Sequence, residues 1–387
     1  MPALLLTIFI DTVGFGIVLP LLPYFAEQFS ATPLQVTLLA TIYSFSQFLF
    51  APIWGRMSDK LGRRPIILCT LCGMFLGYIL LTFANSLLSL FLARAFTGLM
   101  AANAGVVQAF IADITTNFDR AGAMAKVGAA HGLGFIFGPV IGGIFAGPDP
   151  LNPNLHLPFL IAAVLSVLAF GIAIFKVKET RGNEIRARAS KNQRSFLRVF
   201  NEAIKVPQLI WLLIVITLTP FVFSGIETTF VMWSERAFGW GPQQNGEIYA
   251  FMGLTAAATQ WFLVGRLTRK FGEHKLIFLG AILICTGSAM IPFTLGTISL
   301  CIAFGFIVFG VSINNPSLSS LVSKFADVDE RGSLLGIAHS CSAMARITGP
   351  AWAGFAFGLF GRDWPFFSGA LVMVLMFFLA FLIKPKK

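Results

Sequence analysis

Charged side chains are scarce in this chain of 387 residues. Asp, Glu, Lys and Arg make up 12% of it, hydrophobic residues make up 56%, and the mean hydropathy is +0.81. Because about a quarter of the residues in a soluble domain are charged, this composition excludes a soluble globular protein. Tyrosine is also scarce, with 4 residues against 42 phenylalanines. The chain is therefore predicted to be an integral membrane protein.

Several catalytic and cofactor-binding motifs are absent. The sequence has no H-E-x-x-H pattern and no set of nucleophile, base and electrophile that would converge, which argues against a membrane-embedded enzyme. It has no G-x-x-x-x-G-K-S/T loop, so ATP is not expected to drive it. Cys69 and Cys72 form a C-T-L-C pair without further ligands, and we interpret them as small apolar residues. We expect no cofactor and no metal.

Long apolar runs divide the chain into helices. A helix needs about 20 apolar residues to cross about 30 Å of hydrocarbon, and twelve such runs are predicted, with boundaries accurate to about four residues. They cover residues 4–26, 34–55, 66–84, 87–112, 121–146, 157–176, 207–234, 243–265, 274–293, 296–322, 332–359 and 364–383. The predicted fold class is an all-α membrane protein with twelve transmembrane helices.

The basic residues predict the orientation of these helices, because Lys and Arg favour cytoplasmic loops. Of the 28, Arg94 and Arg346 fall inside spans, and one set of alternate loops holds only Arg236 and Arg362. The remaining 28 − 4 = 24 lie in the other loops and the adjoining helix ends. With an even number of spans, both termini are expected in the cytoplasm. This bias accounts for the net charge of +11 without a nucleic-acid partner.

An internal repeat divides the chain into two halves. The stretch "GRMSDKLGRRP" at 55 is echoed by "GRLTRKFGEHK" at 265, an offset of 265 − 55 = 210. "DRAG" at 119 and "GPVIGG" at 138 are echoed by "ERGS" at 330 and "GPAWAG" at 349, each at an offset of 211. We therefore predict an N-terminal six-helix bundle at 1–176, a cytoplasmic basic linker at 177–206 and a C-terminal six-helix bundle at 207–387. Parallel repeats of this kind are a recurring architecture of transporters.

At these motifs the chain resembles a known family. The signature stretch between the second and third helices is similar to that of the major facilitator superfamily. "DTVGFGIVLPLLP", "RAFTG" and "GLGFIFGPVIGG" resemble its drug:proton antiporter branch, and "FAPIWGRMSDKLGRRP" and "ERAFGW" resemble the twelve-helix tetracycline exporters. The chain departs from those exporters at Gly77, Ala256 and Ile284, which replace an acid, a histidine and an acid. Tetracycline itself is therefore not expected as the substrate.

The charged stretch at 55–65 is interpreted as a conformational latch. We expect the second helix to end near Gly55 and the chain to turn tightly at Gly62. The resemblance implies that Asp59 lies against the N-terminus of the eleventh helix and that Arg63 pairs with Asp113. The alternative is a solvated basic loop that only sets the topology. The residues assigned to the latch are Gly55, Asp59, Gly62, Arg63, Arg64 and Asp113.

Two acids inside predicted spans are candidates for a proton and substrate site, because ionisable groups in a membrane are functional hypotheses by default. Asp11 lies in the first helix with Phe15 one turn along, and Glu227 lies in the seventh helix between Phe223 and Phe230. A carboxylate beside aromatic rings suits a lipophilic cation. A carboxyl removed from water also holds a proton at neutral pH more readily, and a competitor can displace it.

Two arginines and several amides extend this candidate site. The resemblance places Arg94 near the cavity, and the alternative is an arginine that snorkels to the outer interface. Arg346 either modulates the protonation of Glu227 or forms a buried structural ion pair with it. Polar side chains that could line a cavity or link helices are Asn103, Gln108, Gln260, Asn314 and Asn315. His131 and His339 are interpreted as satisfied hydrogen-bonding residues.

The fifth helix carries a glycine-rich motif that the resemblance connects with export. Its members are Gly134, Gly138, Pro139, Gly142 and Gly143. Glycines permit close backbone approach between helices, and the resemblance implies that this motif seals the interface between the halves in antiporters.

The sequence thus predicts a proton-coupled antiporter that exports amphipathic small molecules, cations among them, by alternating access. Two six-helix bundles would rock about a central cavity lined mainly by helices 1, 4, 7 and 10. The alternative is a solute uptake symporter or facilitator of the same fold, since a fold does not decide direction or substrate. The expected partners are the substrate, protons and membrane lipid. The resemblance implies a monomer in the bacterial cytoplasmic membrane and a role in multidrug efflux.

Overall fold

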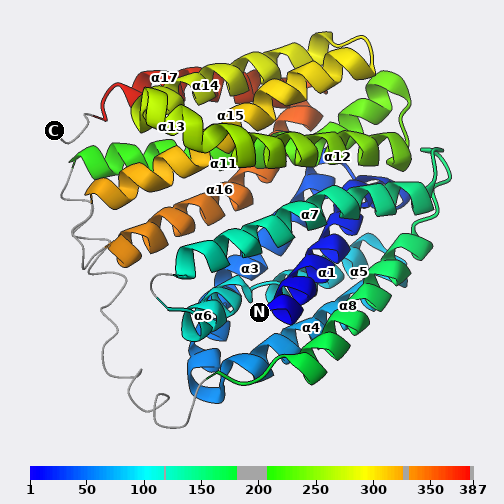
Figure 1. The fold of residues 1–387 in the computed structure, drawn as a ribbon. Helices are drawn as coiled ribbons and strands as arrows, with labels where there is room; N and C mark the ends of the chain where they lie inside the picture. Colours follow the sequence, from blue (N-terminus) through cyan, green and yellow to red (C-terminus); the bar gives the residue numbers. More distant parts are fainter. Residues whose placement is uncertain (117–118, 181–206, 326–330, 384–387) are drawn as a thin grey trace. The chain divides into compact units, whose positions relative to one another are not determined.

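The computed structural model of the chain is all-helical (Figure 1). It describes residues 1–387 except 117–118, 181–206, 326–330 and 384–387. Most of the predicted basic linker at 177–206 therefore lies outside the described residues. Each of the twelve predicted spans corresponds to one helix or to consecutive helical segments in the described residues, which confirms the predicted fold class.

The first six spans are formed by eight α-helices and one 3-10 turn. These are α1 (Pro2–Val18), η1 (Leu19–Leu21), α2 (Leu22–Gln28), α3 (Pro33–Leu61), α4 (Arg63–Thr82), α5 (Leu87–Met100), α6 (Ala104–Ile114), α7 (Arg120–Ala146) and α8 (His156–Lys176).

The last six spans are α11 (Pro207–Phe238), α12 (Pro242–Ala258) with η3 (Thr259–Val264) and α13 (Gly265–Phe271), α14 (Glu273–Met290) with η4 (Ile291–Phe293), α15 (Thr297–Phe325), α16 (Arg331–Phe360) and α17 (Trp364–Ala380). The segment η3 is a π-helical turn between α12 and α13.

Length and hydropathy make these helices suitable for a membrane. Ten segments of the described chain are long and apolar enough to cross one, and α17, with 17 residues, is a shorter apolar helix. At about 1.5 Å per residue, the 29 residues of α3 reach beyond the hydrocarbon core. Large apolar side chains such as Phe175 and Trp261 are exposed, as expected for surfaces that face lipid. The chain is a multi-pass integral membrane protein.

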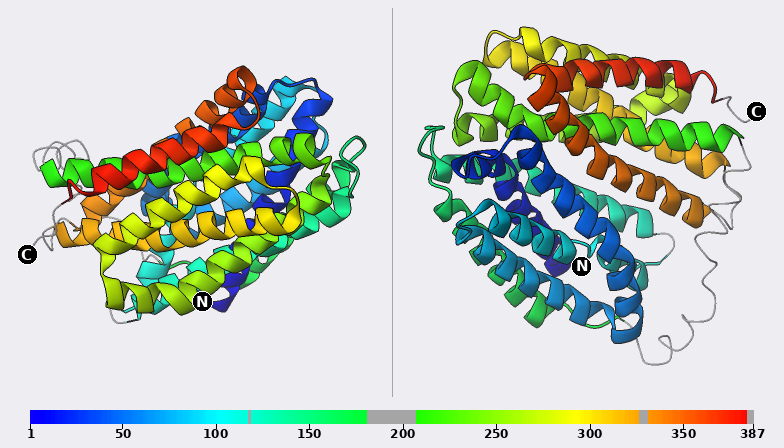
Figure 2. Two further views of the ribbon diagram at one scale, coloured as in Figure 1. Left: turned by 90° about the horizontal axis from the view of Figure 1, so that it is seen from above. Right: turned by 180° about the vertical axis from the view of Figure 1, so that it is seen from behind.

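The helices form two compact units, each described here by itself. One unit holds the described part of Met1–Gln193 together with Ser234–Gly253, and the other holds the described part of Arg194–Trp233 together with Leu254–Lys387. In the first unit, α1 packs against α7 and α8, and α4 packs against α5 and α8 (Figure 1). In the second unit, α14 packs against α15 and α17 (Figure 2). These units differ from the division at 207, because the end of α11 and most of α12 pack with the first unit.

The second helix is longer than the sequence predicted. It continues through Gly55 and ends at Leu61, so the charged stretch is mostly helical and the connection to α4 is the single residue Gly62. The expected end near Gly55 is therefore wrong. Charged side chains outside the hydrocarbon do not end a helix, whereas Gly62, at φ = 107°, adopts a conformation that favours glycine.

The internal repeat is visible in the backbone and in the packing of each unit. Gly272, 210 residues after Gly62, connects α13 to α14 with φ = 76° in the same way. A Cβ added at Gly16 would lie 3.1 Å from Gly138 Cα, where α1 meets α7. A Cβ added at Gly225 would lie 3.2 Å from the Gly349 carbonyl oxygen, where α11 meets α16. The same close crossing of two helices therefore occurs once in each unit.

Candidate functional site

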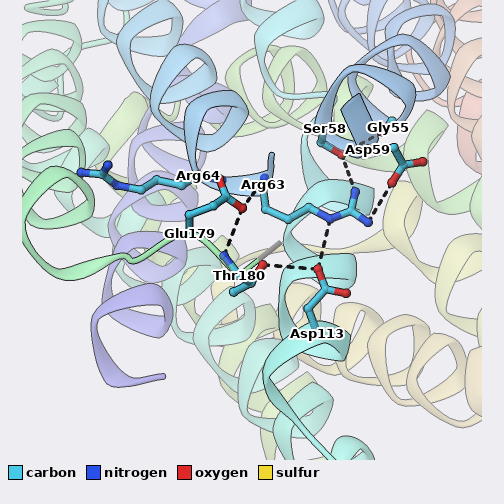
Figure 3. Close-up of polar contacts among 8 residues, drawn as sticks. All are labelled: Gly55, Ser58, Asp59, Arg63, Arg64, Asp113, Glu179 and Thr180. Atoms are coloured by element: carbon cyan, nitrogen blue, oxygen red, sulfur yellow. Dashed lines mark hydrogen bonds and ion pairs between the residues drawn. The ribbon is translucent and has the colours of Figure 1, made fainter. Parts of the chain in front are cut away.

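Arg63 is the centre of an ion-pair cluster at one end of the first unit (Figure 3). Its side chain is 7% exposed, its Nη2 lies 2.9 Å from Asp59 Oδ1, and its Nε donates to Asp113 Oδ2 at 3.3 Å. Its Nη1 also donates to Ser58 Oγ. Because Asp59 and Ser58 lie on α3 and Asp113 lies on α6, the guanidinium at the start of α4 joins three helices. The pairing of Arg63 with Asp113 that the resemblance implied is present.

The other expected latch contact cannot be assigned. The start of the eleventh helix adjoins residues 326–330, which lie outside the described residues, so a contact with Asp59 there remains a prediction. Gly55 lies inside α3, and its carbonyl oxygen accepts a hydrogen bond from Ser58 Oγ at 2.8 Å. Of the latch residues, Asp59 and Asp113 thus pair directly with Arg63.

Glu179 and Thr180, which the sequence analysis missed, join this cluster from the segment that follows α8 (Figure 3). The Glu179 carboxylate accepts from the backbone N–H groups of Arg63 at 3.0 Å and Arg64 at 3.2 Å. Thr180 Oγ1 donates to Asp113 Oδ2 at 3.3 Å, and Arg64 Nη2 donates to a carbonyl oxygen in the last turn of α8 at 2.7 Å. No local sequence pattern predicts these contacts, because Glu179 lies 116 positions after Arg63 in the chain.

The second unit contains a matching ion pair of opposite polarity. Glu273 is the first residue of α14, and its Oε1 lies 2.5 Å from Lys324 Nζ near the end of α15. The positions correspond by the repeat, because 273 − 63 = 210 and 324 − 113 = 211. The acid and the base have exchanged places relative to Arg63 and Asp113. The sequence analysis missed this pair.

Asp11 lies in α1, one helical turn before Phe15. Its Oδ1 is buried and has no hydrogen-bond partner in the described part of the chain. Phe15, one turn along, packs against Tyr43 with ring centroids 5.2 Å apart and against Phe135 at 5.7 Å. Phe15 therefore belongs to a group of three rings, whereas the sequence indicated a single aromatic side chain.

Arg94 lies on α5 and is buried, with 2% of its surface exposed. Its Cζ lies 4.2 Å from the centroid of the Tyr43 ring, a cation–π arrangement, and its Nε donates to the Leu39 carbonyl oxygen at 3.4 Å. This burial argues against an arginine that snorkels to the interface. Arg94 and Asp11 both lie within electrostatic reach of Tyr78 on α4.

Glu227 lies in α11, and Arg346 of α16 is within electrostatic reach of its carboxyl. The two predicted roles of this pair, as a structural ion pair and as a modulated proton site, both remain compatible with that arrangement. Phe223 is half-buried, but Phe230 is fully buried and packs against Phe304 with centroids 4.7 Å apart. Phe230 therefore lies in the packed interior between α11 and α15 and not on an accessible surface beside Glu227.

The glycine-rich motif of the fifth helix lies on α7 and packs against two helices, α1 and α12. Three of its glycines face α1: Gly134, Gly138 and Gly142. A Cβ added at Gly138 would lie 2.7 Å from Gly16 Cα, and one added at Gly143 would lie 2.7 Å from the Pro242 carbonyl oxygen of α12. The Pro139 carbonyl also faces α12, within 2.5 Å of a Cβ added at Gly246. The absence of side chains thus allows α7 to pack against α1 and α12 together.

Comparison with known families shows which family this chain belongs to. The sequence matches the family described as Major Facilitator Superfamily over residues 4–350 and again over residues 236–387. The chain belongs to the Major Facilitator Superfamily. It is therefore a transporter and not an enzyme.

Curated relatives of this Major Facilitator Superfamily protein include resistance proteins. It is 32% identical over 364 residues to the class B tetracycline resistance protein of Escherichia coli, covering 90% of this chain and 86% of that one. It is 29% identical over 391 residues to multidrug resistance protein 2 of Bacillus subtilis (strain 168), covering 99% and 95%. The transporter is thus related to tetracycline and multidrug resistance proteins.

Solved structures support the fold of this Major Facilitator Superfamily transporter. The nucleoside transporter NupG superposes with a TM-score of 0.81 at 14% sequence identity, with 100% of this chain and 99% of that chain covered. At this identity the similarity concerns the fold alone.

The amides of the transporter divide into two groups. Asn103 and Asn314 are buried and link helices, since Asn103 Nδ2 donates to Thr70 Oγ1 at 2.9 Å and Asn314 Nδ2 donates to Thr219 Oγ1 at 3.4 Å. Exposed on helix surfaces, and thus candidates for a water-filled path, are Gln108, Gln260 and Asn315. Among the residues that the structure describes, no three His, Cys, Asp or Glu side chains are grouped to hold a metal ion.

Proposed function

We propose that this Major Facilitator Superfamily transporter is a proton-coupled antiporter that exports amphipathic, cationic small molecules by alternating access. The observation that carries the proposal is a carboxyl inside a membrane-spanning helix of each unit with an arginine in the same neighbourhood. Asp11 shares its neighbour Tyr78 with Arg94, and Glu227 lies within reach of Arg346. The names of the curated relatives supply the expected class of cargo.

Competition for one carboxyl would couple the proton to the substrate. Burial favours the protonated acid, whereas an approaching cation favours the carboxylate. A proton and a cationic substrate therefore do not occupy the same acid together, and the arrival of one releases the other. The arginine beside each acid limits the cost of the deprotonated state. This exchange breaks no covalent bond and needs no cofactor.

The aromatic residues around Asp11 would favour organic cations over small inorganic ones. Phe15 lies one helical turn from Asp11, and its ring contacts the rings of Tyr43 and Phe135. Rings offer apolar surface and a negative face to a lipophilic cation, while a sodium ion needs several oxygen ligands that this group lacks. We therefore expect protons to be the coupling ion.

In this proposal the Arg63 cluster times the opening of the transporter, and the glycine motif of α7 seals the interface between the halves. The transporter acts as a monomer in the bacterial cytoplasmic membrane, with both termini and the basic linker in the cytoplasm.

The test uses purified protein in liposomes with an imposed pH gradient. A lipophilic cation, a zwitterion and tetracycline are added one at a time while the lumenal pH is recorded. We expect a cation to collapse the gradient with the parent protein and with Glu247→Gln, which alters an exposed acid of α12. We expect at least a tenfold slower exchange with Glu227→Gln or Asp11→Asn, because each removes a titrating carboxyl.

If no compound moves the gradient while the same liposomes take up a labelled solute, the antiport proposal is wrong. The protein is then a facilitator or a carrier coupled to another ion. If exchange persists unchanged in both acid variants, antiport survives but its assignment to Asp11 and Glu227 fails.

A further inference from the structure

Tyr78 Oη on α4 and Asp11 Oδ1 on α1 are among the buried polar atoms of the first unit that have no hydrogen-bond partner in the described residues. Tyr78 is 1% exposed, so its hydroxyl has no access to bulk water. Buried hydroxyls and carboxyls are nearly always paired, and an unpaired one in a native structure calls for an explanation. Neither atom is explained by the helix packing alone.

The two groups lie in one neighbourhood. A Cβ added at Gly14 of α1 would lie 3.0 Å from Tyr78 Oη, so the hydroxyl reaches the surface of α1. Gly14 is three residues after Asp11, and residues three apart lie on adjoining parts of one helix face. The Asp11 carboxyl is also within electrostatic reach of Tyr78. Gly14 thus leaves room for the hydroxyl beside the acid.

Charged and titratable groups also lie on the helices that pack against α1 and α4. Tyr43 of α3 and Arg94 of α5 also act on Tyr78, and the Arg94 guanidinium packs on the Tyr43 ring. From α7, His131 Nδ1 lies 3.0 Å from the carbonyl oxygen one turn earlier in its own helix, and Lys126 is exposed. On α8, His156 Nδ1 lies 2.8 Å from a carbonyl oxygen at the end of α4. Tyr78 is therefore an available donor for Asp11.

We propose that Tyr78 is the positioning residue for the proton site at Asp11, its hydroxyl donating a hydrogen bond to the Asp11 carboxylate once the proton has left. The bond is direct or passes through one water, and it is absent while Asp11 is protonated. A hydrogen bond to the charged form of an acid favours that form. The hydroxyl would thus limit the cost of an ionised Asp11 in the membrane and determine the pH at which Asp11 releases its proton.

This inference rests on the proposed function, because it assumes that Asp11 titrates during transport. It adds a residue that neither the sequence motifs nor the family comparison assigns.

The test is the variant Tyr78→Phe, which removes the hydroxyl and keeps the ring. The first readout is the pH dependence of proton-for-cation exchange in liposomes. The second is the infrared carbonyl band of the protonated Asp11 carboxyl, identified by its loss in Asp11→Asn and titrated in purified protein. We expect the titration midpoint to move upward by about one to two pH units, as the loss of a hydrogen bond to a charged group implies. The KM for the cation should change less than twofold.

A matched control is Ser288→Ala. Ser288 occupies the repeat position of Tyr78, since 288 − 78 = 210, and its Oγ is also buried without a hydrogen-bond partner in the described chain. Because the repeat position of Asp11 holds no acid, this variant should leave the midpoint unchanged. A second perturbation is Gly14→Ala, whose added methyl group would displace the Tyr78 hydroxyl and should move the midpoint in the same direction.

An unchanged midpoint in Tyr78→Phe, with normal folding by circular dichroism, overturns the inference. If Tyr78→Phe fails to fold, the Gly14→Ala titration decides instead. The infrared titration does not depend on finding a substrate, so a failure of the proposed function and a failure of this inference remain distinguishable.

Discussion

Removal of the Glu179 carboxylate should loosen the start of α4. In Glu179→Ala the N–H groups of Arg63 and Arg64, which now donate to that carboxylate at 3.0 and 3.2 Å, lose their acceptor. A missing N-terminal cap costs about 0.5–2 kcal/mol, and a lost negative charge at a helix N-terminus costs about 0.3–1 kcal/mol. Because Glu179 is exposed and screened by solvent, the lower part of both ranges applies, about 1 kcal/mol in total.

The effect is local, so the assay should be local. A loss of about 1 kcal/mol in opening free energy corresponds to roughly fivefold faster amide exchange. Hydrogen–deuterium exchange of the peptide that contains Arg63 and Arg64 should show this acceleration in Glu179→Ala. Glu179→Gln, which keeps an acceptor but loses the charge, should show about half the change in free energy. High salt should reduce the difference between Glu179→Gln and the parent.

The control is Glu247→Ala, which removes an exposed acid from α12 and should leave this peptide unchanged. Equal exchange of the peptide in Glu179→Ala and the parent protein would refute the capping role. Equal acceleration in Glu247→Ala would show that general charge, and not the contact, is responsible.

Two further predictions concern the pair in the second unit and the glycine motif. Reversal of the charge of either Glu273 or Lys324 should lower the free energy of unfolding by about 0.5–1 kcal/mol and thereby lower the thermal midpoint. The double reversal should restore part of this loss. Equal midpoints for the single and double variants would show that the pair contributes nothing. Gly138→Ala should destabilise the protein by about 1–3 kcal/mol and slow transport, because the added methyl group would meet α1 at 2.7 Å. Gly132→Ala, which meets nothing within 4 Å, should not, and similar losses in both would contradict the packing argument.

Much of the fold could be predicted from the sequence because a membrane helix is encoded locally. Runs of apolar residues predict the spans, and the matched glycines at Gly62 and Gly272 predict the repeated turn. The end of α3 was placed wrongly because charge was read as the end of the helix, whereas backbone conformation at Gly62 ends it. The break between α5 and α6 at Ala101–Asn103 was not predicted, since no proline or charge marks it.

The candidate site was less predictable, because its contacts join distant segments. Asp11, Arg94 and Glu227 could be singled out as ionisable groups in apolar helices, and Arg63 with Asp113 by resemblance. Tyr78 could not, because one tyrosine in an apolar helix is usually an ordinary packing residue. Phe230 shares a helix face with Glu227 by spacing, but packing against α15 determines its exposure.

The opposite polarity of the two ion pairs explains why a further carboxylate binds at the start of α4. A helix N-terminus attracts negative charge, so Glu273 suits the first position of α14, whereas Arg63 opposes the dipole of α4. The start of α4 therefore binds the carboxylate of Glu179 from the segment that follows α8, whereas α14 begins with an acid of its own. The two copies of the repeat thus depend on different neighbours. A recombinant chain carrying two first halves would reproduce every helix, yet its second copy would lack an acid at its helix start unless the segment corresponding to Glu179 were copied too.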